Sequence, residues 1–308
     1  MKALLPTRGI QYRANLHAHT TLSDGSFEPS DLIEGYRAGG YAVLALTDHE
    51  RPGDLAGLVR PDVLLLRGFE AAFGEAGRGT PTRRTCHVVF LEKNPDAAPP
   101  ASFLPPPDAR VYDPDAVCEA LFRASACGWW PILAHPFWSL EDPRDFVRYE
   151  GLGGVEVYNH LCAEAGSDDR SAVALDAFAR AGRALLPVAA DDAHGAPAFG
   201  GFEMICAREL SYPAVVEALQ AGDAYASTGP LILSLASEDG ALVFSSSEVR
   251  TARLVSDVRP VGARLSDPAG CLTAGRIPFD PAAAWVRLEL TDVDGRTAWT
   301  RPYRADEL

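Results

Sequence analysis

Short apolar runs alternate with helix-like segments from Tyr12 to about Pro230. The run YRANLHAHT precedes the helical pattern PSDLIEGYRAGG, which begins at a proline and ends at two glycines, and the apolar run YAVLALTDHE follows. Later apolar runs are WWPILAHP, GGVEVYNH and ALLPVAADDAH, with helical patterns between them. This alternation predicts an α/β domain in which helices cover a parallel sheet. Six to eight repeats in about 220 residues favour a closed barrel.

The pattern changes after the segment STGP at residues 227–230. The rest of the chain consists of strand-like pieces broken by turns, and Asp294-Gly295 is a strong hairpin signal. We therefore predict two domains, an α/β domain over residues 1–230 and a small all-β appendage over residues 231–308. Within the first domain, DVLLLRGFEAAF and TCHVVFLE are interpreted as adjoining strands. The stretch NPDAAPPASFLPPPDARVY has too many prolines for a helix or a central strand and is interpreted as a surface excursion.

Histidines and acidic residues gather where the predicted strands end. Six of the seven histidines lie at or near strand ends, namely His17, His19, His49, His87, His135 and His194. In a parallel barrel those ends meet on one face. His17 and His19 are two residues apart on a strand, so both point to the same side, and Asp192 and His194 have the same spacing near the other end of the domain.

Imidazoles mixed with carboxylates and no thiolate are typical of a Zn²⁺, Mn²⁺ or Fe²⁺ site. The predicted metal ligands are His17, His19, Asp24, His49, Glu70, His87, His135, Asp192 and His194. Nine side chains are too many for one ion, so we expect two or three divalent ions with a bridging carboxylate. Asp192 and His194 are also the candidate catalytic residues.

Several of these residues have a second interpretation. A lone histidine such as His87 within CHVVFLE is more often a packed core residue than a ligand. Asp48 is a candidate ligand, an orienting residue or a helix cap, and we favour the orienting role. Glu156 in GVEVYN is equally well explained by a structural role. For His160, which follows VEVYN, substrate contact and support of the ligands are equally compatible with the sequence, as they are for Tyr158 and Asn159.

Composition narrows the classes of partner. The chain has 308 residues and a formal net charge of −14, and only Lys2 and Lys93 are lysines. Binding to duplex nucleic acid is therefore disfavoured, while a small anionic substrate remains compatible with a few arginines and bound cations. The N-terminus lacks the pattern of a signal peptide and no stretch approaches a membrane span, so we expect a cytoplasmic protein. The six cysteines form no Cys-x-x-Cys pair and are expected to be free thiols.

The motifs NLHAHTTLSDG, LALTDHE, GFE, LAHP and ADDAH resemble those of the PHP (polymerase and histidinol phosphatase) superfamily of metal-dependent phosphoesterases. The resemblance covers about residues 12–230 and implies a distorted seven-stranded (β/α) barrel that holds up to three divalent ions. The segment CARELSYPAVVEALQAGDAYASTGP and the β region after it are similar to the branch of carbaryl-hydrolase-like enzymes.

Carried over motif by motif, the resemblance implies a first ion surrounded by His17, His19, Glu70 and Asp192. Glu70 would bridge to a second ion held by His87 and His135, and a third would be held by Asp24, His49 and His194. A histidine often stands at the position of Asp24 in relatives, which leaves the metal identity open.

The leading functional prediction is hydrolysis of a phosphate ester of a small molecule, of the nucleotide or sugar phosphate class, by a hydroxide that the ions hold. Arg83 and Arg84, just before His87, and His160 are the candidate substrate-binding residues. One rival is hydrolysis of a carboxylic or carbamic ester by the same centre. Another is a non-catalytic, metal-stabilised binding module, which the full ligand set argues against.

Overall fold

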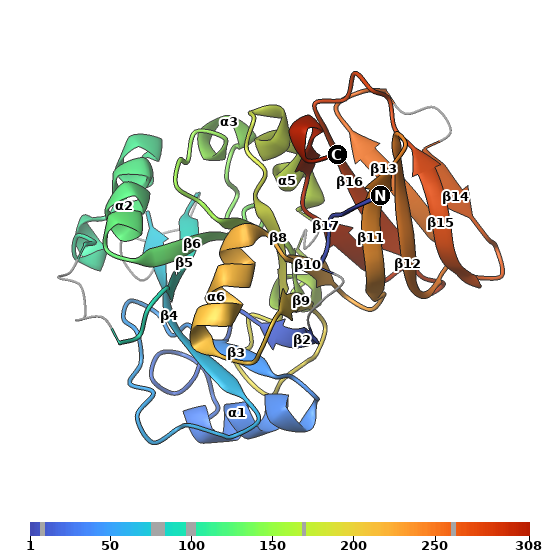
Figure 1. The fold of residues 1–308 in the computed structure, drawn as a ribbon. Coiled ribbons are helices and arrows are strands. Elements are labelled where there is room, and N and C mark those ends of the chain that lie inside the picture. The colour runs from blue at the N-terminus through green and yellow to red at the C-terminus, as the bar shows by residue number, and fades with distance from the viewer. Residues whose placement is uncertain (7–9, 75–83, 97–102, 168–170, 260–262) are drawn as a thin grey trace.

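The computed structural model describes residues 1–6, 10–74, 84–96, 103–167, 171–259 and 263–308. The fold is mixed α/β with one large sheet, which confirms the predicted class (Figure 1). Within the described residues this sheet contains fourteen strands in the order β14-β13-β16-β17-β10-β9-β2-β3-β4-β5-β6-β7-β8, with β18 beside β16. A second sheet has the order β1-β11-β12-β15.

The strands up to the end of the α/β region have the following bounds: β1 Lys2–Ala3, β2 Ile10–Asn15, β3 Val43–Leu46, β4 Leu64–Phe73, β5 Cys86–Glu92, β6 Trp129–Ala134, β7 Gly154–Asn159, β8 Leu186–Ala190, β9 Phe202–Ala207 and β10 Ala224–Ser227. The later strands are β11 Ile232–Glu238, β12 Ala241–Val249, β13 Thr251–Ser256, β14 Arg264–Ser266, β15 Leu272–Pro278, β16 Trp285–Thr291, β17 Thr297–Thr300 and β18 Tyr303–Arg304. The helices are α1 Pro29–Ala38, α2 Pro114–Ala126, α3 Pro143–Phe146, α4 His160–Glu164, α5 Ala172–Arg180 and α6 Tyr212–Ala221, with 3₁₀ turns at Pro107–Ala109 and Ala305–Glu307.

The large sheet is not uniformly parallel, so that prediction is wrong. The pairs β2·β3, β3·β4, β6·β7 and β7·β8 are parallel, whereas β5 runs antiparallel to both β4 and β6. No described helix lies between β4 and β5, so they pair as a hairpin does, as expected for adjoining strands. The antiparallel β9, which the sequence analysis did not assign, pairs with β2 and β10.

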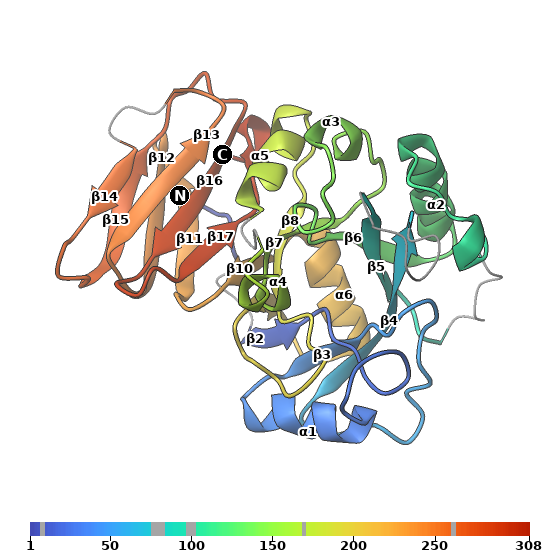
Figure 2. The same ribbon diagram turned by 180° about the vertical axis from the view of Figure 1, so that it is seen from behind.

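Alternate residues of the strands point into one apolar cluster, which positions the edge that carries the candidate site. Val43 and Ala45 of β3, Val89 of β5 and Ile132 of β6 belong to this cluster. The buried face of α6, including Val215, packs against the same cluster. The other sides of the strands are covered by α1, α2 and α5 (Figure 2). Closure into a seven-stranded (β/α) barrel remains a prediction.

The C-terminal strands form two facing layers with a common core. Leu235 and Phe244 of the smaller sheet pack in one cluster with Leu254 and Leu288 of the larger sheet. The hairpin signal at Asp294-Gly295 is confirmed, because β16 and β17 pair antiparallel across that turn. The proposed boundary near residue 230 falls between β10 and β11, and β17 pairs directly with β10.

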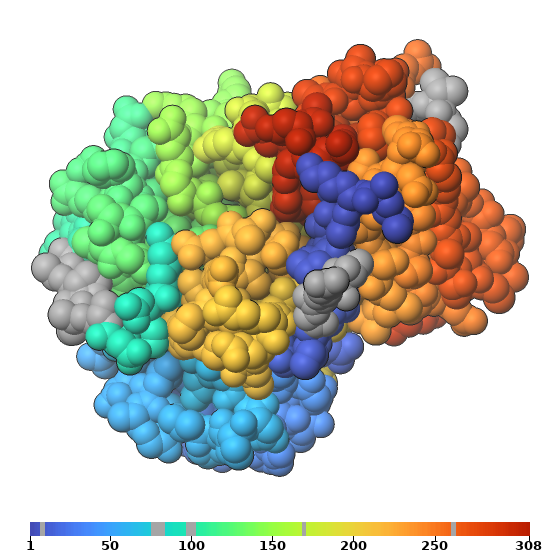
Figure 3. Space-filling model, viewed as in Figure 1, coloured from blue at the N-terminus to red at the C-terminus, as the bar shows by residue number. Residues whose placement is uncertain are grey.

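The two ends of the chain meet in this β-rich region. Strand β1 pairs antiparallel with β11, and Figure 3 shows the N-terminal residues lying on the surface of the C-terminal strands. Within the proline-rich stretch, residues 97–102 lie outside the described part, whereas Phe103 is buried against the aromatic core of β4 and β5. Among the described residues, no helix has the length and apolar character needed to cross a membrane.

Candidate metal centre

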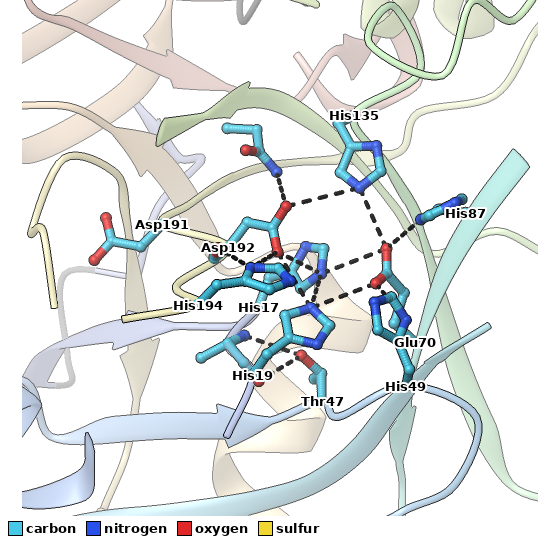
Figure 4. A network of polar contacts seen from close by, with 12 residues as sticks. His17, His19, Thr47, His49, Glu70, His87, His135, Asp191, Asp192 and His194 are labelled. Atoms are coloured by element: carbon cyan, nitrogen blue, oxygen red, sulfur yellow. Dashed lines mark hydrogen bonds and ion pairs between the residues drawn. The ribbon is translucent and has the colours of Figure 1, made fainter. Parts of the chain in front are cut away.

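Nine side chains that are far apart in the sequence converge at one edge of the large sheet, and Figure 4 labels all of them except Asp24. His17 and His19 follow β2, His49 follows β3, Glu70 lies in β4, His135 follows β6, and Asp192 and His194 follow β8. His87 is the second residue of β5, and the antiparallel register places it opposite Ala72 of β4 and Ala134 of β6. The reversed strand therefore contributes its first residues to the edge where its neighbours end.

Glu70 occupies the middle of the cluster, and its two carboxylate oxygens face different imidazoles. Oε1 lies 2.9 Å from Nδ1 of His87 and 3.2 Å from Nε2 of His135. Oε2 lies 3.4 Å from Nε2 of His19 and 3.2 Å from Nδ1 of His49. A carboxylate with this arrangement suits a bridge between two cations.

Three groups of potential ligand atoms lie within the cluster. They are His17, His19 and Asp192; His17, Glu70 and His135; and His19, Asp24, His49 and His194. In the last group, Asp24 lies 3.3 Å from Nε2 of His194 and 3.5 Å from Nε2 of His49. The geometry thus brings together all nine residues that the sequence analysis named, and their coordination of ions stays a prediction.

Glu156 of β7 ties three parts of the centre together. Its Oε1 lies 2.7 Å from Nδ1 of His17, and its Oε2 accepts hydrogen bonds from the backbone N–H of His135 at 2.8 Å and from Asn159 at 3.0 Å. Asn159 also donates to Asp192 at 3.1 Å. Because Glu156 is only 1% exposed, these contacts fix the His17 ring with little competition from water. The local sequence left the role of Glu156 undecided.

Two further buried aspartates hold the loops that carry the ligands. Asp48 accepts from the backbone N–H of Thr20 at 2.7 Å and from the Ser23 hydroxyl at 2.8 Å, so it shapes the loop before Asp24. This agrees with the orienting role favoured from the sequence. Asp191 turns away from the cluster and accepts hydrogen bonds from Tyr36 Oη and from the backbone N–H groups of residues 199–201 (Figure 4). The sequence analysis missed Asp191, although the acidic doublet at a strand end was a usable signal.

Two of the predicted ligands have backbone conformations that non-glycine residues rarely adopt. The φ angle is 26° at His135 and 51° at Asp192. Such conformations persist only where the surroundings hold them, and here the N–H of His135 is held by Glu156 and the carboxylate of Asp192 by Asn159. The strain therefore coincides with the residues whose side chains point into the cluster.

The carboxylates control the protonation of the central imidazoles. Burial opposes protonation of His17, but Asp192, Glu156 and Glu70 outweigh it and hold its pKa well above the usual value. Burial likewise opposes protonation of His19, and Asp192 and Glu70 overcome it to raise its pKa to about 9. Burial would raise the pKa of Glu70, but His87 and His17 lower it well below its usual range. At His49, burial is the main cause of a lowered pKa.

The donor set fits divalent cations. Nδ1 of His19 and Oδ1 of Asp192 are buried and make no hydrogen bond within the described part of the chain. Oδ1 of Asp192 lies 3.3 Å from Nε2 of His17 and 3.2 Å from Nε2 of His19, so three ligand-type atoms face a common point. Buried polar atoms in native proteins nearly always have a partner, and a cation would supply one here.

Two of the three predicted substrate-binding residues, His160 and Arg84, lie in the described part of the chain, and their described contacts are not with this cluster. His160, at the start of α4, pairs with Tyr158 Oη at 2.9 Å and with Glu164 at 3.4 Å. Arg84 lies 3.4 Å from Asp145 and 3.7 Å from Asp142, so its charge is directed to two acidic neighbours. Arg83 lies outside the described residues. A substrate role for these residues stays a prediction.

Comparison with known proteins bears first on the fold. No protein-family model matches the chain. A solved two-domain protein from Bacteroides vulgatus, containing a predicted PHP-like metal-dependent phosphoesterase, aligns over 98% of both chains with a TM-score of 0.51 and 16% identity. The protein has the PHP-like fold. The resemblance to the PHP superfamily is thereby confirmed for the fold, whereas the carbaryl-hydrolase-like branch stays a prediction.

Other similarities to known proteins are more limited. A 3′,5′-nucleoside bisphosphate phosphatase from Chromobacterium violaceum is 36% identical over 85 residues, which span 26% of this chain and 28% of the phosphatase. An amidohydrolase from the same organism, solved with bound sulfate and no metal, aligns over 59% of this chain with 19% identity and a TM-score of 0.44. The curated relative thus matches little more than a quarter of its own length.

Proposed function

We propose that the protein is a metal-dependent hydrolase that cleaves a phosphate ester of a small molecule. The observation that carries the proposal is the position of Glu70, whose two oxygens face separate sets of imidazoles in a cluster of nine potential ligands. The local similarity to a 3′,5′-nucleoside bisphosphate phosphatase supports a phosphate ester of the nucleotide class. Hydrolysis would join a water oxygen to phosphorus, break the bond to the leaving oxygen and return a proton to that oxygen.

The proposal includes two or three divalent ions held by the nine residues, with Mn²⁺, Zn²⁺ and Fe²⁺ as candidates. Such ions would supply Lewis acidity and lower the pKa of a coordinated water toward neutral pH. Their binding would displace the protons that Asp192 and Glu70 stabilise on His17 and His19.

The chain's own residues contribute positioning and proton transfer. The Nδ1 of His194 lies 2.9 Å from the backbone oxygen of Asp192, which fixes the ring and assigns the proton to Nδ1. The side chain of His194 is 27% exposed, so it can reach a leaving oxygen at the mouth of the site. Oδ1 of Asp192 lies 3.3 Å from Nε2 of His17 and 3.2 Å from Nε2 of His19, so it orients both rings. His194 is therefore the proposed proton carrier of a centre with two ions, in which its Nε2 is not taken by a third ion, and Asp192 is the proposed ligand and positioning residue.

The same donor set also suits hydrolysis of a carboxylic or carbamic ester, and the assay must separate the two reactions. Purified protein should be depleted of metal, reloaded with Mn²⁺, Zn²⁺ or Fe²⁺, and tested against phosphate monoesters and against carboxyl and carbamate esters of the same alcohols. Metal-dependent release of phosphate is the expected result. Cleavage of the carbamates alone would replace the proposal with its rival, and metal binding without turnover of any ester would indicate a binding module. A cytoplasmic location and a small anionic substrate remain part of the proposal.

A further inference from the structure

Trp138 differs from the other tryptophans of this protein. The other four, Trp129, Trp130, Trp285 and Trp299, are at most 7% exposed, whereas Trp138 is 41% exposed. Its ring centroid lies 4.9 Å from that of His135 and 5.7 Å from that of His87, with interplanar angles of 79° and 72°. A large apolar ring is thus kept partly in water while it touches two imidazoles of the candidate metal centre. Exposed aromatic rings at a site of this kind are typical of ligand contacts.

Other exposed apolar side chains lie in the loops that supply the centre. Leu22 is 46% exposed and lies two residues before Asp24. Leu140, 58% exposed, follows His135 in the same loop as Trp138. The loops at this edge therefore present apolar side chains as well as ligands. Scattered exposed leucines are common, so the ring of Trp138 beside the two histidines is the observation that selects a ligand chemistry.

Two arginines in the neighbouring described segments, Arg84 and Arg110, already have acidic partners. Arg84 faces Asp142 and Asp145. Arg110, which is buried, donates to Glu50 at 2.5 Å, and Glu50 directly follows His49. A substrate whose remote part carried several negative charges would have to compete with these carboxylates. An uncharged planar ring would not.

We propose that Trp138 is a specificity-determining residue that stacks against a planar aromatic or heteroaromatic ring in the leaving group of the substrate. The inference rests on the proposed function, because the candidate metal centre would hold the phosphate while Trp138 contacts the ring. It narrows the substrate class to phosphate esters in which a ring lies close to the ester oxygen. A sugar phosphate without a ring of this kind would gain nothing from the contact.

Binding of phosphonates tests the contact without turnover, because their carbon–phosphorus bond is not hydrolysed by ester cleavage. Phenylphosphonate and methylphosphonate should be titrated into the zinc-loaded protein, since Zn²⁺ has no redox chemistry. We expect phenylphosphonate to bind about tenfold more tightly, in line with the energy of an aromatic pair added to the burial of the ring. The preference should persist in Trp138→Phe and fall severalfold in Trp138→Leu.

The protein also offers a direct optical readout. Acrylamide is neutral and is not repelled by the chain's negative charge, and Trp138 is the tryptophan it reaches most easily. Phenylphosphonate should protect this fluorescence from quenching, and methylphosphonate should not. Phe122→Leu is the matched control, since Phe122 is 72% exposed on α2, and it should leave both the phosphonate preference and the quenching unchanged.

The outcomes separate this inference from the proposed function. An equal preference for phenylphosphonate in the wild type and in Trp138→Leu, at equal zinc content, would overturn the role of Trp138. Turnover gives the independent measurement: Trp138→Leu should raise KM for phenyl phosphate by about tenfold and leave KM for glycerol 2-phosphate unchanged. If the loaded protein cleaved aryl carbamates and no phosphate ester, the proposed function would fail, and the phosphonate preference would still decide whether the ring lies on Trp138.

Discussion

Charged side chains are buried in two regions of the molecule, and the two regions differ in whether these side chains find hydrogen-bond partners within the chain. At the seam between α5 and the C-terminal strands, the side chain of Arg287 is 1% exposed. Its Nε and one terminal nitrogen donate to Asp176 at 2.7 and 3.2 Å, and its second terminal nitrogen donates to Glu289 at 3.0 Å. At the metal centre, by contrast, His19 and Asp192 keep buried atoms without a hydrogen bond in the described chain. A buried charge whose hydrogen bonds are made within the chain supports the fold, whereas buried ligand-type atoms that lack a hydrogen bond are a sign of a site that is completed by a ligand.

The largest effect is expected for Glu70→Gln. The amide keeps the shape of the side chain but removes the bridging charge, so the protein should lose at least one ion and roughly a thousandfold in activity. Elemental analysis after gel filtration and the turnover number measure the two losses. The variant should remain folded by circular dichroism, because a neutral side chain of the same shape is tolerated where a buried charge was. Unchanged metal content would remove Glu70 from the centre.

Arg287→Ala tests the other side of the comparison. Removing the arginine leaves Asp176 without its bidentate partner and should lower the free energy of unfolding by about 3–5 kcal/mol. Metal content and KM should stay as in the wild type, because no candidate ligand among the described residues comes from the segment after residue 230.

The control for this variant is Arg253→Ala. Arg253 is 54% exposed and pairs with Glu289, which keeps Arg287 as a partner when Arg253 is removed, so the loss should be about 1 kcal/mol or less. Urea unfolding compares both variants with the wild type. If Arg287→Ala lost its ions while it remained folded, the separation between a structural seam and a metal-binding edge would be wrong.

The sequence predicted which residues gather at the candidate metal centre better than it predicted the directions of the strands in the large sheet. The two-residue spacing of His17 and His19, and of Asp192 and His194, is a local property of extended chain, and it placed each pair on one side. The direction of β5 is set by its pairing with β4 and β6, and no local pattern in CHVVFLE encodes it. His87 nevertheless reached the centre, because reversal of the strand moved its first residues to the same edge.

Contacts between distant segments account for what the sequence analysis missed. Strand β1 pairs with β11 across more than 200 residues, and β17 pairs with β10. No local sequence motif predicts the register of either pair. Glu156 sits within GVEVYN, where alternation assigns it to a strand but not to a partner. Its contact with His17 bridges 139 residues and becomes visible only when β7 and β2 are placed.

A smaller effect is expected for Glu156→Gln, which weakens the support of the centre and leaves its ligands intact. The amide no longer holds Nδ1 of His17 with a negative charge, which lowers the basicity of Nε2, and it brings a donor toward the Asn159 amide, so metal affinity should fall 10–100-fold. Competition with a chelator measures this affinity. Glu164→Gln is the control, because that glutamate is 66% exposed on α4 and contacts only His160 among the described partners. Equal affinities in the two variants would assign Glu156 a purely structural role.

An effect that appears only as the pH changes concerns Glu141, a buried carboxyl whose unfavourable burial is relieved by a proton and not by a cation. It accepts from Tyr149 Oη at 2.8 Å, and burial raises its pKa to about 8 despite the opposing hydrogen bonds from Tyr149 and Cys86. The folded pKa lies above the unfolded one, so the stabilisation by the neutral acid is complete below about pH 4.5 and is lost as the pH rises to 8.

Glu141→Gln stays neutral throughout. The wild type should therefore lose stability relative to this variant as the pH rises. The difference between their free energies of unfolding should change by at most about 1.4 kcal/mol per pH unit between pH 5 and 8. Urea unfolding of the two metal-free proteins at four pH values tests this, because the raised pKa values of His17 and His19 affect both proteins alike. Parallel pH profiles would mean that Glu141 is already ionised in the folded protein, and that this region, like the seam at Arg287, compensates its buried charge from within.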